Sequence, residues 1–143
     1  MLDFGKSFLD GRRVFRDGKT ARGFFAGVFG GIVAGGILSF IMLSVFFTDA
    51  RAQFIGFSLM ALGTMLGDAL GSFLKRRLGI EPGKPFILDQ LMFLVVALVL
   101  VYPFVLPNLY SIENIVLLFV VTYVLHTGSN WAANKLGWKK VPW

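Results

Sequence analysis

The sequence has no cysteine and few charged residues. Without cysteine, the protein cannot form disulfides or thiolate metal sites. Charged residues make up 15% of the 143 residues, hydrophobic residues make up 56%, and the mean hydropathy is +0.74. This balance argues against a soluble globular domain and indicates an integral membrane protein. There is also no low-complexity tract or linker, so we expect a single membrane domain over residues 1–143.

Four apolar stretches are long enough to cross a hydrocarbon core of roughly 30 Å at about 1.5 Å per residue. They cover residues 24–47, 54–74, 86–106 and 114–133. The first stretch is too long for a signal peptide, and no small-residue cleavage site follows it. We therefore predict an all-α integral membrane protein with four transmembrane helices.

Basic residues outnumber acidic ones, 14 to 8, for a net charge of +6. Lys and Arg number six before the first predicted span, then one, four and none in the three connections, and three after the last span. By the positive-inside rule, both termini and the connection between the second and third spans are cytoplasmic. We expect a multi-pass protein of the cell membrane whose active site is formed by these cytoplasmic segments.

Two predicted spans carry glycines at four-residue spacing. Small residues at this spacing let helix backbones approach closely in lipid, so we expect these positions to be packing faces. The glycines are Gly27, Gly31 and Gly35 in the first span and Gly63, Gly67 and Gly71 in the second.

The third span contains Pro103, which should kink or end the helix near its external end.

A carboxylate lies inside the second predicted span. Asp68, Ser72 and Lys75 follow the spacing i, i+4, i+7, which places them on one stripe of a helix with the carboxylate about 10 Å deeper than the ammonium. A carboxylate at the bilayer centre costs about 2.5 to 3.5 kcal/mol, so it should face protein, water or a cation. An intramembrane acid indicates a functional site, and a polar contact between helices is the simpler alternative.

A second acid, Asp89, precedes Gln90 at the cytoplasmic start of the third predicted span. The predicted topology places Asp68 and Asp89 in the same half of the membrane, beside a run of Lys and Arg. Phosphoryl chemistry needs oxygen ligands for Mg²⁺ and cations for the remaining phosphate charge. The two acids and the basic run therefore indicate a site for phosphate chemistry.

The basic N-terminal segment contains Gly18, Lys19 and Thr20, which invite a P-loop interpretation. The P-loop pattern requires a glycine where Arg13 stands, so that interpretation fails. The segment still offers backbone N–H groups, Lys19 and Arg22 to an anion. An electrostatic anchor to anionic lipid headgroups is the alternative.

The last predicted span turns polar toward its cytoplasmic end. His126 and Asn130 lie four residues apart and share a helix face. This face either lines the cavity that contains Asp68 or is satisfied by a neighbouring helix.

Four segments in the same order resemble a known family. They are "GKTARG" before the first span, "GDALGSFLKRRLG" ending the second, "PFILDQL" opening the third, and the tail "HTGSNWAANKLGWKKVPW". Together they resemble the CDP-archaeol synthases, the archaeal CTP-dependent cytidylyltransferases of ether-lipid synthesis. The CDP-diacylglycerol synthases share the pattern more distantly.

The resemblance implies a Mg²⁺-dependent transfer of CMP from CTP to an isoprenoid ether lipid phosphate, an unsaturated archaetidic acid, with release of pyrophosphate. It implies membrane lipid as surroundings and no nucleic acid as partner. Asp68 and Asp89 are expected to bind the metal and, with Lys75, to be catalytic. Gln90, His126 and Asn130 are expected to line the cavity. The expected nucleotide-binding residues are Gly18, Lys19, Thr20, Arg22, Ser72, Lys75 and Arg76.

The chain departs from its relatives at two points. The family usually has a further hydrophobic helix before the "DGRR" segment, whereas here 23 residues precede the first predicted span, as in a shortened chain. Met92 stands where the diacylglycerol relatives carry another acid, so we expect one Mg²⁺ ion and not two. A CDP-diacylglycerol synthase and a CTP-dependent polyprenol kinase remain alternatives, with a small ion- or proton-coupled transporter behind them.

Overall fold

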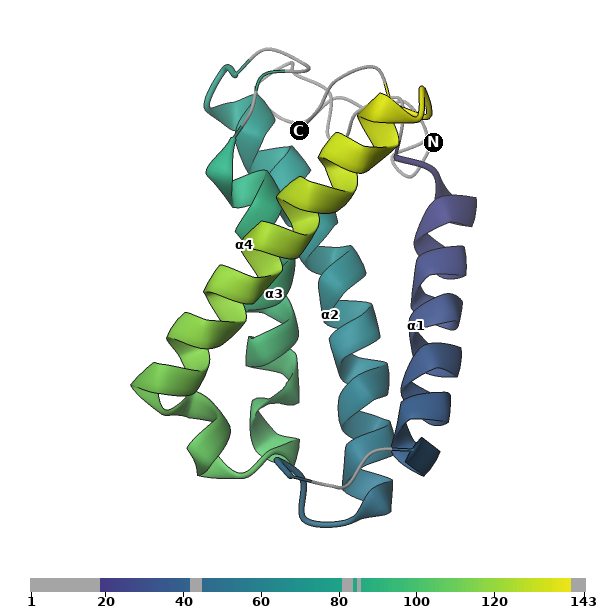
Figure 1. Cartoon of the computed structure of the whole chain (residues 1–143), viewed down its shortest axis with the longest axis vertical. Helices are drawn as coiled ribbons and strands as arrows, with labels where there is room; N and C mark the ends of the chain where they lie inside the picture. Colours follow the sequence, from purple (N-terminus) through teal and green to yellow (C-terminus); the bar gives the residue numbers. More distant parts are fainter. Residues whose placement is uncertain (1–18, 42–44, 81–83, 85, 140–143) are drawn as a thin grey trace.

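The structure is a computed structural model that describes residues 19–41, 45–80, 84 and 86–139. Within those residues the chain forms helices, and its one strand-like contact is a bridge between Phe47 and Val105. The all-α prediction is confirmed. The elements are α1 (Ala21–Ile41), α2 (Ala50–Arg77), α3 (Ile87–Val101), the 3₁₀ helices η1 (Tyr102–Phe104) and η2 (Pro107–Tyr110), and α4 (Ile112–Lys135) (Figure 1).

Among the described elements, α1, α2 and α4 are long and apolar enough to cross a membrane. With 28 residues, α2 is about 42 Å long at 1.5 Å per residue, which exceeds a core of roughly 30 Å, and its last turn holds Lys75, Arg76 and Arg77. With 15 residues, α3 is only about 22 Å long, shorter than the stretch 86–106 that we predicted. The helix ends early because Pro103, in η1, has no N–H to continue it.

The helix α2 lies between α1 and α3 (Figure 1), and the α1 glycines form its contact with α1. Each step of four residues up α1 matches a step of four down α2, so the two helices run antiparallel in constant register. A side chain larger than hydrogen would collide at each contact. An added Cβ would lie 2.5 Å from the facing side chain, at Gly27 from Met65, at Gly31 from Ala61 and at Gly35 from Phe57.

The contact of α2 with α3 is closer still, because it brings backbone against backbone. A Cβ added at Gly63 would lie 2.6 Å from the Cα of Ala97, and one added at Gly67 would lie 2.5 Å from the Cα of Phe93. The prediction that the glycines of both spans are packing faces is confirmed for these positions. Their close approach fixes the depth of Asp68, which follows Gly67, relative to α3.

The bundle has two chemically different ends (Figure 1). At one end α1 begins, α2 ends, α3 begins and α4 ends; we call it the basic end, because Lys19 and the run Lys75 to Arg77 belong to it. At the opposite end lie η1, η2 and residues 45–49, which precede α2. There the Leu106 N–H donates to the Phe46 carbonyl at 2.8 Å, and Asp49 caps α2. Hydrogen bonds from the backbone N–H groups of Ala52 and Arg51 hold the pKa of Asp49 below its usual value.

Candidate functional site

The carboxylate inside α2 has a cationic partner from the start of α1. Lys19, two residues before α1 begins, forms an ion pair with Asp68 through its Nζ and the Oδ2 atom. The two residues are 49 positions apart in the chain and meet because α1 packs antiparallel against α2. The sequence assigns Lys19 to the nucleotide and Asp68 to the metal, and the structure brings the two side chains together.

Both members of the pair are accessible from outside the bundle. The side chain of Lys19 is 26% exposed and that of Asp68 is 43% exposed. A ligand could therefore reach the two charges.

The predicted nucleotide residues beside Lys19 start the helix α1. The Thr20 hydroxyl oxygen accepts a hydrogen bond from the Gly23 N–H at 3.0 Å, and the Thr20 carbonyl accepts one from the Phe24 N–H at 3.0 Å. These bonds satisfy N–H groups that the first turn of a helix leaves without partners. Arg22, in the same turn, is exposed. Thr20 thus fixes the backbone immediately after Lys19.

The three residues of the basic run at the end of α2 lie in different surroundings. The Lys75 ammonium donates to the carbonyl of Lys84 at 2.6 Å, which ties α2 to the segment before α3. Arg77 places its guanidinium over the Phe73 ring, 4.4 Å from the centroid, and its nitrogen atoms are buried. Arg76 and Ser72 are partly exposed, and Ser72 follows Asp68 by one turn. A role of Lys75, Arg76 or Ser72 toward a nucleotide stays a prediction.

The polar face of α4 meets α3 near the level of Asp68. The His126 ring lies 5.4 Å from the Phe93 ring, with the planes tilted by 42°. The backbone of Phe93 packs against Gly67, the residue that precedes Asp68. One turn along α4, the Asn130 Oδ1 atom accepts a hydrogen bond from Lys139 at 2.9 Å. That His126 and Asn130 line one cavity with Asp68 stays a prediction.

Three predicted site residues lie outside the part of the chain that the structure describes. They are Gly18 and, for their side chains, Asp89 and Gln90; the backbone of the last two belongs to the first turn of α3, at the basic end. Within the described residues, no group of three or more acidic or histidine side chains gathers around one point. Mg²⁺ commonly takes one or two carboxylates together with phosphate oxygens. Asp68 fits such a site, because it is a partly exposed carboxylate that already holds a cation on one oxygen.

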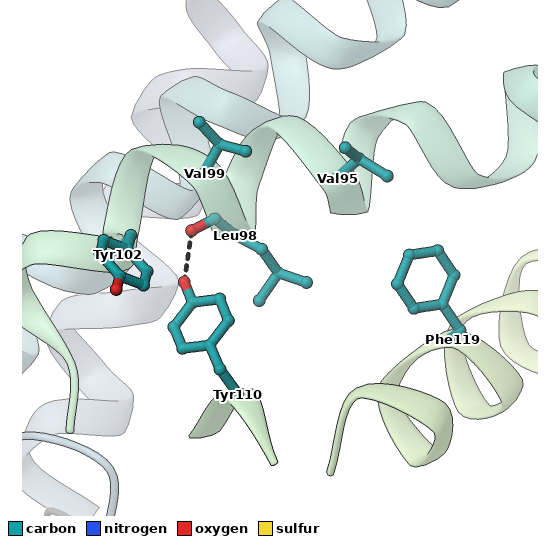
Figure 2. Close-up of a pocket in the computed structure, with 6 residues that line it drawn as sticks. All are labelled: Val95, Leu98, Val99, Tyr102, Tyr110 and Phe119. Carbon is teal, nitrogen blue, oxygen red and sulfur yellow. Dashed lines mark hydrogen bonds between the residues drawn. The ribbon is translucent and has the colours of Figure 1, made fainter. Parts of the chain in front are cut away.

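An apolar pocket of about 330 Å³ opens between α3 and α4, toward the end of the bundle opposite the basic end (Figure 2). The Tyr110 hydroxyl closes one wall by donating to the Leu98 carbonyl at 2.5 Å. Burial and the neighbouring Tyr102 raise the pKa of Tyr110, so its hydroxyl stays protonated. The lining residues are Val95, Leu98, Val99, Tyr102, Tyr110 and Phe119.

We did not predict this pocket from the sequence. Its four residues from α3 and η1 follow the spacing i, i+3, i+4, i+7, which is the usual signal of one helix face. In a helix that is apolar on all sides, this spacing distinguishes no face from another. The pocket arises from the way α4 crosses α3, which the sequence pattern does not state.

Comparison with known proteins gives one consistent family. A model of the family described as CarS-like, CDP-archaeol synthase, matches residues 1–143. The CDP-archaeol synthase of Pyrococcus horikoshii is 43% identical over 143 residues, which are 99% of this chain and 82% of that protein. The CDP-archaeol synthase of Archaeoglobus fulgidus is 43% identical over 152 residues, covering 99% and 83% of the two chains.

A solved structure is also similar to this chain. It is described as an intramembrane enzyme for archaeal membrane lipids biosynthesis. The two structures superpose with a TM-score of 0.74 at 34% sequence identity, over 90% of this chain and 77% of the other. Both the sequence comparisons and the fold comparison therefore extend over nearly the whole chain.

Proposed function

The chain belongs to the CDP-archaeol synthase family, and from this premise we propose that it is a Mg²⁺-dependent cytidylyltransferase that uses CTP and an unsaturated archaetidic acid. An oxygen of the lipid phosphate attacks the α-phosphorus of CTP. The bond from that phosphorus to the bridging oxygen breaks, and CDP-archaeol and pyrophosphate form. The pairing of Lys19 with Asp68 supports this best, because it joins a basic, anion-binding segment to an intramembrane carboxylate.

The residues assigned to the site would divide the work by charge. Asp68, with Asp89, would hold Mg²⁺, which when bound neutralises triphosphate charge and orients the leaving group. Lys75 and Arg76 would offset the remaining negative charge. No covalent enzyme intermediate and no strong base are needed, because a phosphate oxygen is already anionic at neutral pH. The remaining nucleotide contacts would come from Gly18, Lys19, Thr20, Arg22 and Ser72.

The lipid substrate would approach this site from the membrane. If its phosphate reaches Asp68, its isoprenoid chains extend deeper, along the part of α3 that follows Phe93. The apolar pocket begins there, since Val95 is two residues further along the helix and Tyr102 is about 10 Å beyond Val95 at 1.5 Å per residue. An apolar pocket at this depth suits a hydrocarbon chain.

We also propose an orientation in the membrane. Among the described basic residues, Lys19, the run Lys75 to Arg77, and Lys135 belong to the basic end, and by the positive-inside rule this supports a cytoplasmic position for that end. CTP would therefore reach Asp68 without crossing the bilayer.

A direct assay tests the proposed activity. The purified protein is incubated with Mg²⁺, archaetidic acid and each of the four nucleoside triphosphates, and pyrophosphate and lipid products are measured. We expect pyrophosphate and a cytidine-containing lipid with CTP. Release of CDP in place of pyrophosphate would show kinase chemistry, and product from diacylglycerol phosphate alone would show a different lipid specificity.

A further inference from the structure

We propose that Lys19 is an exchangeable cation. In the ligand-free enzyme it neutralises Asp68, and it moves to the triphosphate of CTP when a divalent cation binds Asp68. The proposal rests on the proposed function for the nature of the two ligands. It adds that one side chain links the binding of the metal ion to the binding of the nucleotide.

The register between α1 and α2 shows how far Lys19 reaches. The three glycine contacts place Asp68 opposite Phe24 of α1. Lys19 precedes Phe24 by five residues and lies before the first residue of α1, so its backbone lies further toward the basic end of the bundle than Asp68. The ion pair therefore requires the Lys19 side chain to point inward along the bundle.

That direction is opposite to the usual one. Lysines near the ends of membrane helices keep their apolar stem in the bilayer and direct the ammonium outward to water. Lys19 points inward because a lone carboxylate at the depth of Asp68 would be costly. If another cation neutralises Asp68, the reason for the inward position disappears, and repulsion between the two cations favours the outward one.

The local structure lets the side chain move without unfolding. Thr20 caps α1, so the backbone after Lys19 is held while Lys19 itself precedes the helix. The side chain is 26% exposed, which leaves it a path outward. Arg22, the other described cation of this segment that the sequence offers to an anion, is also exposed.

The consequence is a coupling between the two ligands. A metal ion alone must displace Lys19, and CTP alone finds Lys19 held by Asp68. When both are present, the displaced ammonium gains a phosphate partner, so each ligand should raise the affinity for the other by the same factor. Lys19 thus competes with the metal ion for Asp68 and becomes a contact of the triphosphate once the metal ion has displaced it.

Chemical labelling of the unaltered protein tests the exchange. The reactivity of Lys19 toward an amine-acetylating reagent is measured by peptide mass spectrometry without ligand, with millimolar Mn²⁺, and with Mn²⁺ plus CTP. We expect labelling of Lys19 to rise about tenfold with Mn²⁺ and to fall again with CTP, because an anionic partner favours the protonated, unreactive form of the amine. Lys135, whose ammonium lies near the Trp131 ring, should react equally in all three conditions. Equal labelling of Lys19 with and without Mn²⁺ would overturn the proposal.

Binding of Mn²⁺ to variants, followed by electron paramagnetic resonance without nucleotide, gives a second test. Lys19→Gln should bind Mn²⁺ about tenfold more tightly than the unaltered protein, because no ammonium competes for Asp68. Lys19→Arg and the matched control Lys135→Gln should bind it as the unaltered protein does. Unchanged or weaker binding by a folded Lys19→Gln variant would refute the exchange, and if that variant does not fold, the labelling result decides.

Neither readout requires turnover. An enzyme that shows the labelling pattern but releases no pyrophosphate from CTP would refute the proposed function and leave the cation exchange standing. Pyrophosphate release with unchanged Lys19 labelling would do the reverse.

Discussion

At the scale of single residues, the question is how a carboxylate is tolerated inside an apolar helix. Asp68 is not satisfied by its own helix, where Lys75 shares its stripe but bonds to the Lys84 carbonyl. Its charge is balanced across the helix contact by Lys19. The cation that matters for Asp68 in the ligand-free protein therefore comes from α1, and the basic run of α2 is left for other partners.

The first prediction concerns the metal ligands. Asp68→Asn keeps the size of the side chain but removes the charge that would bind Mg²⁺, so we expect kcat to fall by about 100-fold or more. Asp89→Asn should have a similar effect, and the double variant should be little worse than either single one, because both residues would serve one ion. Pyrophosphate release measures the rate, and circular dichroism checks that the helices are retained. Full activity of either single variant would remove that residue from the site.

The second prediction separates two members of the basic run. Lys75→Gln should lower kcat/KM for CTP by about tenfold, equal to about 1.4 kcal/mol, if its ammonium contacts the triphosphate in the loaded enzyme. Arg77→Gln should act mainly on stability, since it removes a buried guanidinium that stacks on Phe73. Kinetics with CTP and thermal unfolding in detergent distinguish the two effects. Equal, small effects of both changes on kcat/KM would leave the run as a topology signal alone.

At the scale of elements, the glycines of α1 and α2 decide which helices touch and at what depth. The contact at Gly67 is the most consequential, because it sets α3 and the neighbouring Asp68 against each other with no side chain between the backbones. Lipid provides no hydrophobic drive for association, so such close backbone contact carries much of the packing. The position of the site thus depends on residues that have no chemical role in it.

The third prediction compares two glycines in apolar helices. A Cβ at Gly67 would lie 2.5 Å from the Cα of Phe93, whereas one at Gly30 would meet nothing within 4 Å. Gly67→Ala should therefore destabilise the protein by about 1 to 3 kcal/mol, and Gly30→Ala should change stability by no more than about 0.5 kcal/mol. Thermal unfolding in one detergent measures both. Similar melting temperatures for the two variants would contradict the close α2–α3 contact.

The fourth prediction concerns the apolar pocket. Val99→Trp would fill part of it, and we expect KM for the lipid substrate to rise about fivefold, equal to about 1 kcal/mol, with KM for CTP unchanged. Val116→Trp on α4 is a matched control, since both valines are exposed and only Val99 lines the pocket. Initial rates at varied lipid and varied CTP give the two constants. A rise in KM for CTP, or an equal effect of the control, would show that the pocket does not receive the lipid chains.

At the scale of the whole molecule, some features followed from the sequence and others did not. The all-helical fold and the glycine faces were predictable, because length, hydropathy and four-residue spacing are local properties of the chain. The pairing of Lys19 with Asp68 was not, since it depends on the register between α1 and α2, which packing determines. The early end of α3 could be anticipated from Pro103, but the pocket that α4 forms beside it could not.

The last prediction tests how the whole bundle sits in the membrane. The chain has no cysteine, so each single cysteine introduced is a unique label. Leu78, which follows the last residue of α2 at the basic end, and Asn108, in η2 at the opposite end, are both exposed. If the positive-inside rule holds, Leu78→Cys should react with an impermeant thiol reagent only from the cytoplasmic side of sealed vesicles, and Asn108→Cys only from the outside.

Labelling of both cysteines from one side would place η2 and the end of α2 on the same face of the membrane. The bundle would then not span the membrane between its two ends, and α3, the shortest of the described α-helices, would be the element to reconsider, because at about 22 Å it depends on its neighbours and on η1 to reach across.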